Sequence, residues 1–126
     1  MAPIHFAIRY NCTDVAKLLV GAGADVEALF RGKDAPLGLA IASADRHDCV
    51  RVLLEGGSDP NRRLTRKPLP LVSATYDGDP ALVDLLLSHG ADPCAATVHA
   101  SCLSIAAHEG LTAIVSSLIG AGALLA

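Results

Sequence analysis

Apolar residues recur along this chain at the spacing of an amphipathic helix, in four separate segments. Within a segment they stand at positions i, i+3 and i+4, which lie on one side of a helix. The rows are Val15, Leu18 and Leu19; Cys49, Val52 and Leu53; Leu82, Leu85 and Leu86; and Ile114 and Leu118, where Ser117 breaks the row. Because an apolar stripe must be covered, each of these helices is expected to have a packing partner on the next repeat.

Proline and glycine mark where the predicted helices start and stop. Pro3, Pro36 and Pro70 precede the first three apolar rows. Each predicts the start of a short first helix, because the missing N–H of proline costs nothing at the first helical position. Glycines fall just past the second helix of each segment, where a left-handed residue closes the last turn. They are Gly23, Gly57, Gly90 and Gly122, and the Asp that follows in the first three segments predicts a turn leading into a projecting finger.

Taken together, these signals describe a segment of about 33 residues that occurs four times. Its openings are Ala2-Pro3-Ile4-His5-Phe6-Ala7, Ala35-Pro36-Leu37-Gly38-Leu39-Ala40, Leu69-Pro70-Leu71-Val72-Ser73-Ala74 and Ser101-Cys102-Leu103-Ser104-Ile105-Ala106. The segment resembles the ankyrin repeat, whose signature is T-P-L-H-x-A at this period. The resemblance implies an all-α solenoid of four helix–turn–helix units with projecting hairpin-like fingers. We expect one domain over residues 1–126, with repeats at about 1–33, 34–67, 68–99 and 100–126.

The departures from the family pattern concern the repeat openings and the second repeat. The histidine of the signature survives only as His5, which the resemblance implies is a hydrogen-bonding structural residue. The second repeat carries one extra residue within 42–48 and lacks the glycine present as Gly78 and Gly110 in later repeats. Its turn between helices is therefore expected to differ, with Asp45 as the candidate for a positive φ.

Charge is distributed unevenly along the chain, whose formal net charge is −3. All ten Lys and Arg lie in residues 1–67, against eight Asp and Glu, whereas residues 68–126 contain five Asp and Glu and no Lys or Arg. The basic residues crowding the finger between repeats two and three are Arg62, Arg63, Arg66 and Lys67. They are either a solvated loop or a surface that attracts an acidic partner. Nucleic acid is not expected, because no basic stripe alternates with aromatic residues.

The resemblance also implies a protein-binding scaffold that uses its finger tips and the concave face of its first helices. The candidate contacts follow the small Ala of each first helix: Arg9 and Tyr10, Ser43 and Asp45, Tyr76 and Asp77, and His108 and Glu109. Both tyrosines of the chain fall on this ledge, at what the sequence suggests are equivalent places. Since Tyr is enriched among interface hot spots, we favour contact with a partner over mere covering of the groove floor.

Metal and enzymatic chemistry receive little support from the sequence. Cys94, His99, Cys102 and His108 contain ligand types that structural zinc uses, but the repeat register is expected to separate them, so zinc stays a remote alternative and no cofactor is expected. The chain has no phosphate-binding loop, nucleophile elbow or H-E-x-x-H motif. Asp77 and Asp79 are close in sequence but are interpreted as solvated turn residues. No catalytic residue is therefore predicted.

The ends of the chain bear on location and assembly. No secretory signal precedes the first repeat, and the uncharged stretch 110–126 falls short of a membrane span. An intracellular location, cytoplasmic or nuclear and without a membrane contact, is expected. The last helix and tail are rich in apolar residues: Ile114, Val115, Leu118, Ile119, Leu124 and Leu125. We expect them to be partly covered, with self-association as one possibility.

The sequence thus predicts a non-catalytic module that binds another protein. An alternative is an oligomerising or linking scaffold segment of a longer ankyrin array. It draws on the ends of the chain, where the first helix follows Met1 almost directly and no separate capping segment is expected. Terminal repeats ordinarily need polar outer faces for solubility.

Overall fold

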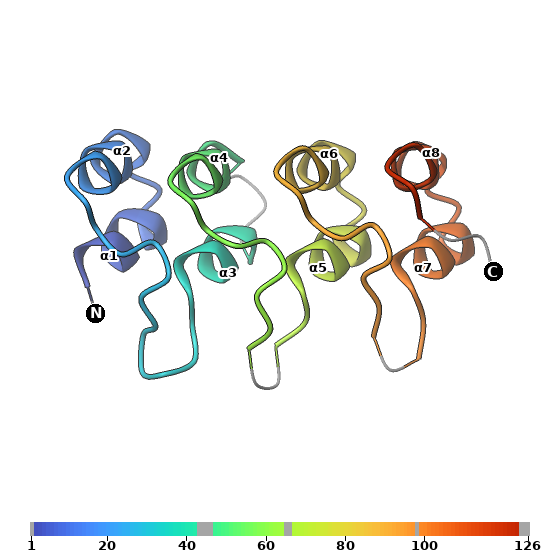
Figure 1. Ribbon diagram of the computed structural model, residues 1–126, viewed down its shortest axis with the longest axis horizontal. Coiled ribbons are helices and arrows are strands. Elements are labelled where there is room, and N and C mark those ends of the chain that lie inside the picture. Colours follow the sequence, from blue (N-terminus) through green and yellow to red (C-terminus); the bar gives the residue numbers. More distant parts are fainter. Residues whose placement is uncertain (1, 43–46, 65–66, 98, 124–126) are drawn as a thin grey trace. The chain divides into compact units, whose positions relative to one another are not determined.

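The computed structural model describes residues 2–42, 47–64, 67–97 and 99–123 of the 126-residue chain. The chain forms two compact units, Met1–Asp59 and Pro60–Ala126. Eight helices are described, and they form four antiparallel helix–turn–helix pairs joined by finger-like loops (Figure 1). The predicted all-α fold of four helix–turn–helix repeats is confirmed.

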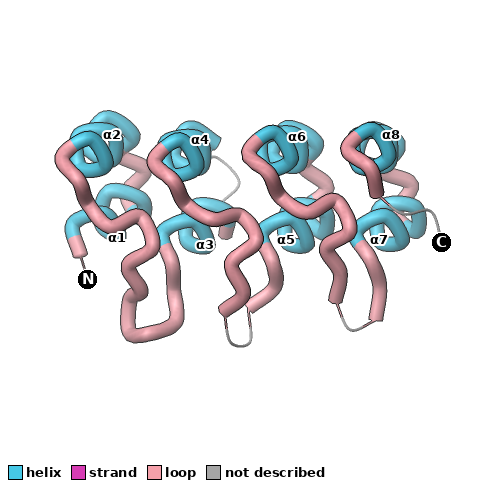
Figure 2. Tube along the Cα trace, in the orientation of Figure 1, coloured by secondary structure: helices cyan, strands magenta, loops and turns pink. Residues whose placement is uncertain are grey.

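Two helix pairs build the first unit. They are α1 (Pro3–Arg9) with α2 (Thr13–Gly21), and α3 (Pro36–Ile41) with α4 (His47–Glu55). Within this unit α1 packs beside α3 and α2 packs beside α4 (Figure 2), so like helices of successive repeats are neighbours. The second unit repeats the arrangement with α5 (Pro70–Asp77), α6 (Pro80–Ser88), α7 (Cys102–His108) and α8 (Thr112–Gly120).

The helix ends lie where proline, glycine and polar caps place them. The prolines predicted to start α1, α3 and α5 occupy their first positions. In α7, where Cys102 replaces proline, the Ser101 hydroxyl accepts a hydrogen bond from the Ser104 N–H at 3.1 Å and caps the helix. The predicted glycines after the second helices have positive φ of 91 to 100°, as their closing role requires. The turn of the second repeat, including Asp45, lies outside the described residues.

Burial of the apolar rows forms the core. Leu53, Leu86 and Leu118 are fully buried, and so is Cys49, whose thiol donates a hydrogen bond to Oδ1 of Asn11 at 3.4 Å. The apolar stripe of α4 thus contacts the preceding repeat, whereas the sequence predicted that it contacts the following repeat. A Cβ at Gly56 would lie 2.5 Å from Cγ1 of Val20, so this neighbour approaches closely.

The first apolar row departs from prediction. Val15 and Leu18 are exposed, although they occupy the stripe positions that are buried in later repeats. The physical reason is that, among the described residues of this unit, no helix pair packs on the side of α1 and α2 that faces away from α3 and α4.

Side chains fasten the bases of the fingers to the repeats. His5 is buried; its Nδ1 accepts from the Ala2 N–H at 3.2 Å, and its Nε2 donates to the Ala28 carbonyl in the first finger at 2.8 Å. The predicted hydrogen-bonding role of His5 is confirmed. In the second unit the Asn61 amide donates to the Gly90 carbonyl at 2.9 Å and accepts from the Asp92 N–H at 2.7 Å.

The four cysteines are free thiols in two environments. Cys12 and Cys94 are exposed, whereas Cys49 and Cys102 are buried. Burial raises the pKa of the Cys102 thiol above its usual range, and this outweighs the opposing effect of its hydrogen bond with Thr75. Since the thiolate is the reactive form, the buried thiols of Cys49 and Cys102 are expected to react slowly with thiol reagents.

Replacing a buried leucine of a second helix by alanine should destabilise the fold far more than replacing an exposed leucine of another second helix. We expect Leu53→Ala and Leu86→Ala each to lower the free energy of unfolding by about 2–5 kcal/mol. Leu18→Ala, at an exposed position, is the matched control and should change it by less than about 0.5 kcal/mol. Urea denaturation followed by circular dichroism measures all three, and a loss below about 0.5 kcal/mol for Leu53→Ala would contradict its place in the core.

Thiol reactivity should separate the two cysteine classes. In native protein we expect two thiols to react rapidly with Ellman's reagent, and the other two only after denaturation, because burial protects them and keeps Cys102 protonated. The double variant Cys12→Ser, Cys94→Ser should lose the rapid phase entirely. Four rapidly reacting thiols in the native protein would show that the core is open.

Candidate functional site

The predicted ledge residues of the second unit come together at the ends of two neighbouring helices. Tyr76 and Asp77 are the last two residues of α5, His108 is the last of α7, and Glu109 is its C-cap. All four side chains are exposed, and α5 packs beside α7. Asp77 and Glu109 add negative charge where the helix carbonyls already carry a partial negative charge. This ledge therefore presents a tyrosine ring among acidic groups.

The first unit carries the ledge residues Arg9 and Tyr10, both exposed. The Tyr10 ring stacks on Phe6, with ring centroids 6.5 Å apart and planes within 4°. The expectation that Tyr10 and Tyr76 are equivalent is wrong by one position. Tyr10, the C-cap of α1, stands seven residues after Pro3, whereas Tyr76 stands six residues after Pro70 within α5, so the counterpart of Tyr76 is Arg9.

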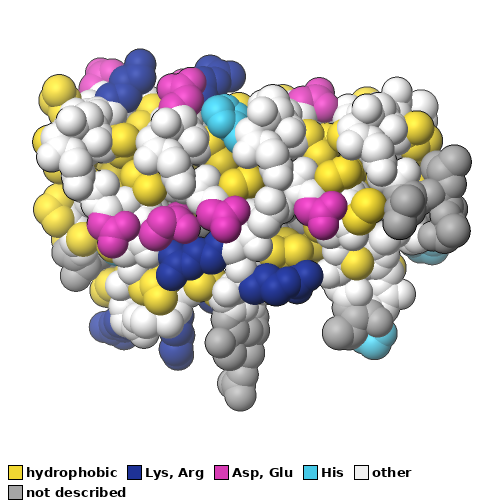
Figure 3. Space-filling view, in the orientation of Figure 1, with side chains coloured by type: hydrophobic (Ala, Val, Ile, Leu, Met, Phe, Trp, Pro, Cys, Tyr) yellow, Lys and Arg dark blue, Asp and Glu magenta, His cyan; other side chains and the backbone are white. Residues whose placement is uncertain are grey.

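The structure describes three of the four basic residues of the second finger. Arg63 and Lys67 are exposed and Arg62 is half-buried; Lys and Arg side chains lie beside this finger in Figure 3. The finger starts at Asn61, whose amide is held against Gly90 and Asp92. Arg66, like Ser43 and Asp45 of the ledge, lies outside the described residues.

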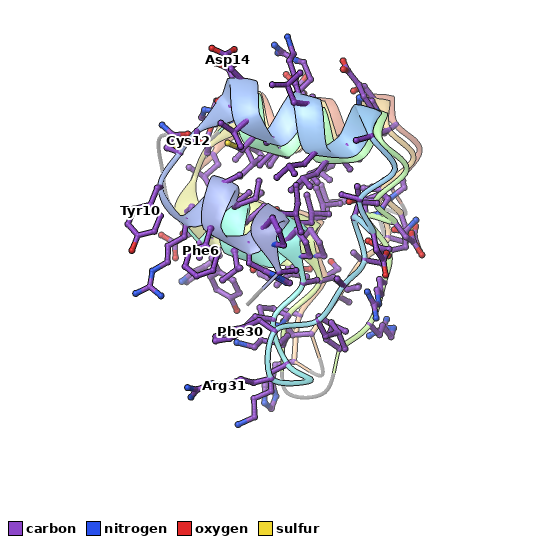
Figure 4. The ribbon with its side chains drawn as sticks, turned by 90° about the vertical axis from the view of Figure 1, so that its left-hand side faces the viewer. Phe6, Tyr10, Cys12, Asp14, Phe30 and Arg31 are labelled. Carbon is purple, nitrogen blue, oxygen red and sulfur yellow. The ribbon has the colours of Figure 1, made fainter. Side chains whose placement is uncertain are left out.

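An apolar groove on the first repeat was not predicted. It has a volume of about 440 Å³, lies open to solvent, and is lined by Pro3, Phe6, Ala7, Tyr10, Cys12, Val15 and Leu19. Figure 4 looks onto this side of α1 and α2, where Phe6 and Tyr10 project from α1 near Cys12. In the sequence this row is as apolar as those of the later repeats and does not reveal that it is exposed. Val15 and Leu18 were instead assigned to the core.

The remaining candidates are the possible metal ligands and the turn carboxylate Asp79. Among the described residues, which include Cys94, His99, Cys102 and His108, no three His, Cys, Asp or Glu side chains are grouped to hold a metal ion. Asp79 caps α6, because its Oδ1 accepts from the Leu82 N–H at 3.2 Å.

The C-terminal helix is covered more completely than its composition suggested. Ile114 and Leu118 are buried and Val115 is half-buried, so Ile119 is the exposed member of this apolar set within the described part of the chain. Leu124 and Leu125 lie outside the described residues. No helix that the structure describes is long and apolar enough to cross a membrane.

Comparisons with known proteins agree with the fold. The model of a family described as ankyrin repeats (3 copies) matches residues 1–64 and 37–125. The chain is 31% identical over 90 residues to a putative ankyrin repeat-containing protein of Treponema pallidum, covering 71% of this chain and 30% of that protein. It is 32% identical over 100 residues to ankyrin repeat and SOCS box protein 16 of Mus musculus, covering 74% and 22%.

A shorter relative has a higher identity over a shorter stretch. Cyclin-dependent kinase 4 inhibitor B of Bos taurus is 44% identical over 64 residues, which are 49% of this chain and 46% of that protein. In each of these three cases the match spans less than half of the relative's own length. With helix pairs repeated at the ankyrin period and a family model matching nearly the whole sequence, this chain belongs to the ankyrin repeat family.

Proposed function

We propose that this chain is a non-catalytic module that binds a partner protein through the ledge at the ends of its first helices and through its finger loops. Ankyrin repeats are generally protein–protein interaction modules, and the bovine relative is named for inhibiting cyclin-dependent kinase 4, itself a protein. The observation that carries the proposal is the exposed group formed by Tyr76, Asp77, His108 and Glu109 on adjacent helices of one unit.

Exposure of Tyr76 supports a contact role. Its side chain is 62% exposed, so it contributes little to the core, and a tyrosine ring can bury a large area at low entropic cost when a partner covers it. Such residues are frequent among those that dominate binding energy. The Asp77 and Glu109 carboxylates beside it would orient polar or basic groups of the partner.

The finger adds charge of the opposite sign in the same unit. Arg63 and Lys67 are exposed, so their expected effect on binding is to attract an acidic surface over a distance, and salt should weaken that attraction. The partner we propose therefore has an acidic patch that meets the finger. The second candidate function, an oligomerising or linking scaffold segment, is favoured by a different observation, the apolar groove of the first repeat.

Partner capture tests the proposal directly. The chain is used as bait in an affinity pull-down analysed by mass spectrometry, beside a Tyr76→Ala bait. A protein retained by the original chain and lost from the variant identifies a ledge-dependent partner. Capture that is equal with both baits would place the interface away from the ledge.

Once that partner is identified, the ledge and the finger should affect different rate constants of binding. Tyr76→Ala should mainly raise the dissociation rate and weaken binding by about 1–4 kcal/mol. Replacing Arg63 and Lys67 by Ala should mainly lower the association rate and flatten its dependence on salt. Surface plasmon resonance at two salt concentrations measures both effects.

The matched control for the charge removal is Arg51→Ala, which takes an exposed arginine from the outer helix α4, where it faces Asp48 at 3.7 Å. It should leave both rates unchanged. If the finger variants behave like this control, the finger does not steer association. If Tyr76→Ala keeps the original dissociation rate, the ledge is not the contact.

A further inference from the structure

The tip of the first finger is a tight hairpin that Phe30 and Asp34 close through their backbones. The Phe30 N–H donates to the Asp34 carbonyl at 2.8 Å, and the Lys33 N–H donates to the Phe30 carbonyl at 3.1 Å. Between them, Arg31 and Gly32 have positive φ, of 55° and 70°. Hairpin turns with two successive positive φ angles favour Asn, Asp or Gly at both places. Glycine at position 32 meets this preference, whereas Arg31 does not.

Arg31 therefore occupies a backbone conformation that is unfavourable for it. Positive φ is uncommon for residues with a Cβ, because the side chain crowds the backbone. The Arg31 side chain is exposed, so burial in the core does not offset this cost. Backbone strain of this kind is found where the strained residue takes part in binding or catalysis. The tip thus invites the question of what its side chain contacts.

An aromatic neighbour positions the Arg31 guanidinium. Its Cζ lies over the Phe30 ring, 5.2 Å from the ring centroid, within the range of a cation–π contact. The Phe30 ring in turn lies beside His5, with ring centroids 6.0 Å apart. His5 is buried, and its Nε2 is bonded to the Ala28 carbonyl of the same finger. These contacts connect the exposed guanidinium to the core of the first repeat, which lowers the entropy that binding would cost.

The charged donors at the tip have no acceptor within the part of the chain that the structure describes. Neither the Arg31 guanidinium nor the Lys33 ammonium forms an ion pair or hydrogen bond there. Contact with an aromatic ring does not satisfy the N–H groups of a guanidinium, whose planar fork matches the two oxygens of a carboxylate. Figure 4 shows Arg31 projecting from the end of the finger, toward the side of the first repeat on which Tyr10 lies.

We propose that Arg31 and Lys33 bind a carboxylate in an acidic segment of a partner protein, with Arg31 as the bidentate donor. The proposal rests on the proposed function only in taking the ligand to be a protein. Its site belongs to the first unit and shares no residue with the ledge of the second. The finger's Asp25 and Glu27 lie toward its base, where the Asp25 carboxylate accepts from the Glu27 N–H at 2.9 Å. Leu29, 37% exposed beside the tip, adds an apolar contact.

Titration of the isotopically labelled chain with hexaglutamate tests the site, because NMR reports each arginine separately. The Arg31 Nε–H and the backbone N–H groups of Gly32 and Lys33 should shift together and give one dissociation constant. Arg51 is the internal control, since it is exposed in the same unit and faces Asp48 at 3.7 Å. Its Nε–H should saturate at a peptide concentration roughly threefold higher or more. An Arg31 signal that responds no more strongly than that of Arg51 would overturn the proposal.

Two substitutions separate the guanidinium from its charge. Arg31→Gly removes the group and suits a positive φ, so the hairpin should persist. The Gly32 and Lys33 signals should then report an affinity about threefold to tenfold lower. Arg31→Lys keeps the charge but loses the planar fork, and its affinity should fall nearly as far. The matched control Arg51→Ala should bind like the original chain. Undiminished affinity in Arg31→Gly or in Arg31→Lys would contradict the bidentate role.

A second probe tests the class of ligand. A single-stranded thymidine hexanucleotide offers phosphates in place of carboxylates, and it should shift the Arg31 signal less than hexaglutamate does. Tighter binding of the oligonucleotide at Arg31 would identify nucleic acid as the ligand and overturn the assignment to a protein.

The outcome at the tip is independent of the ledge. Tyr76→Ala should titrate with hexaglutamate like the original chain, because Tyr76 lies in the other unit. If no ledge-dependent partner is captured, the tip can still bind the peptide, and if the tip fails to bind, the ledge proposal stands. The two proposals therefore fail separately.

Discussion

Every helix in this chain is too short to be stable alone. The described helices have six to nine residues, whereas isolated helices below about 12–15 residues are marginal in water. Each pair must therefore gain its stability from an apolar contact with another pair, on one side or on both. In the first unit this contact buries Ile8 and Ala16 on one partner and Cys49 and Leu53 on the other.

That requirement decides which residues are available for recognition. Positions inside the stack are occupied by small or closely fitted side chains, such as the buried Ala7 and Ala40. Exposed polar and aromatic groups gather at the ends of the first helices, in addition to the charged residues on the second helices and the fingers. Tyr76 and Glu109 are of this kind, which is why they can contact a partner without disturbing the core.

Local sequence signals predicted the elements well, because the causes are local. Pro36 and Pro70 start helices since their fixed φ and missing N–H suit the first position of a helix. The exposure of Leu18 was not predictable from its row, because the burial of a stripe depends on a neighbouring repeat far away in sequence. The offset between Tyr10 and Tyr76, by contrast, is visible in the sequence and was missed, since Tyr10 stands seven residues after Pro3 and Tyr76 six residues after Pro70.

The hydrogen bonds at the finger bases have a consequence for how binding preferences can evolve. His5 binds the backbone carbonyl of Ala28, and Asn61 binds backbone groups of Gly90 and Asp92. Because each anchor recognises main chain, it holds its loop whatever side chains that loop displays. Mutation can therefore exchange the displayed residues freely, and a lineage carrying this architecture can acquire new partners without passing through unstable intermediates.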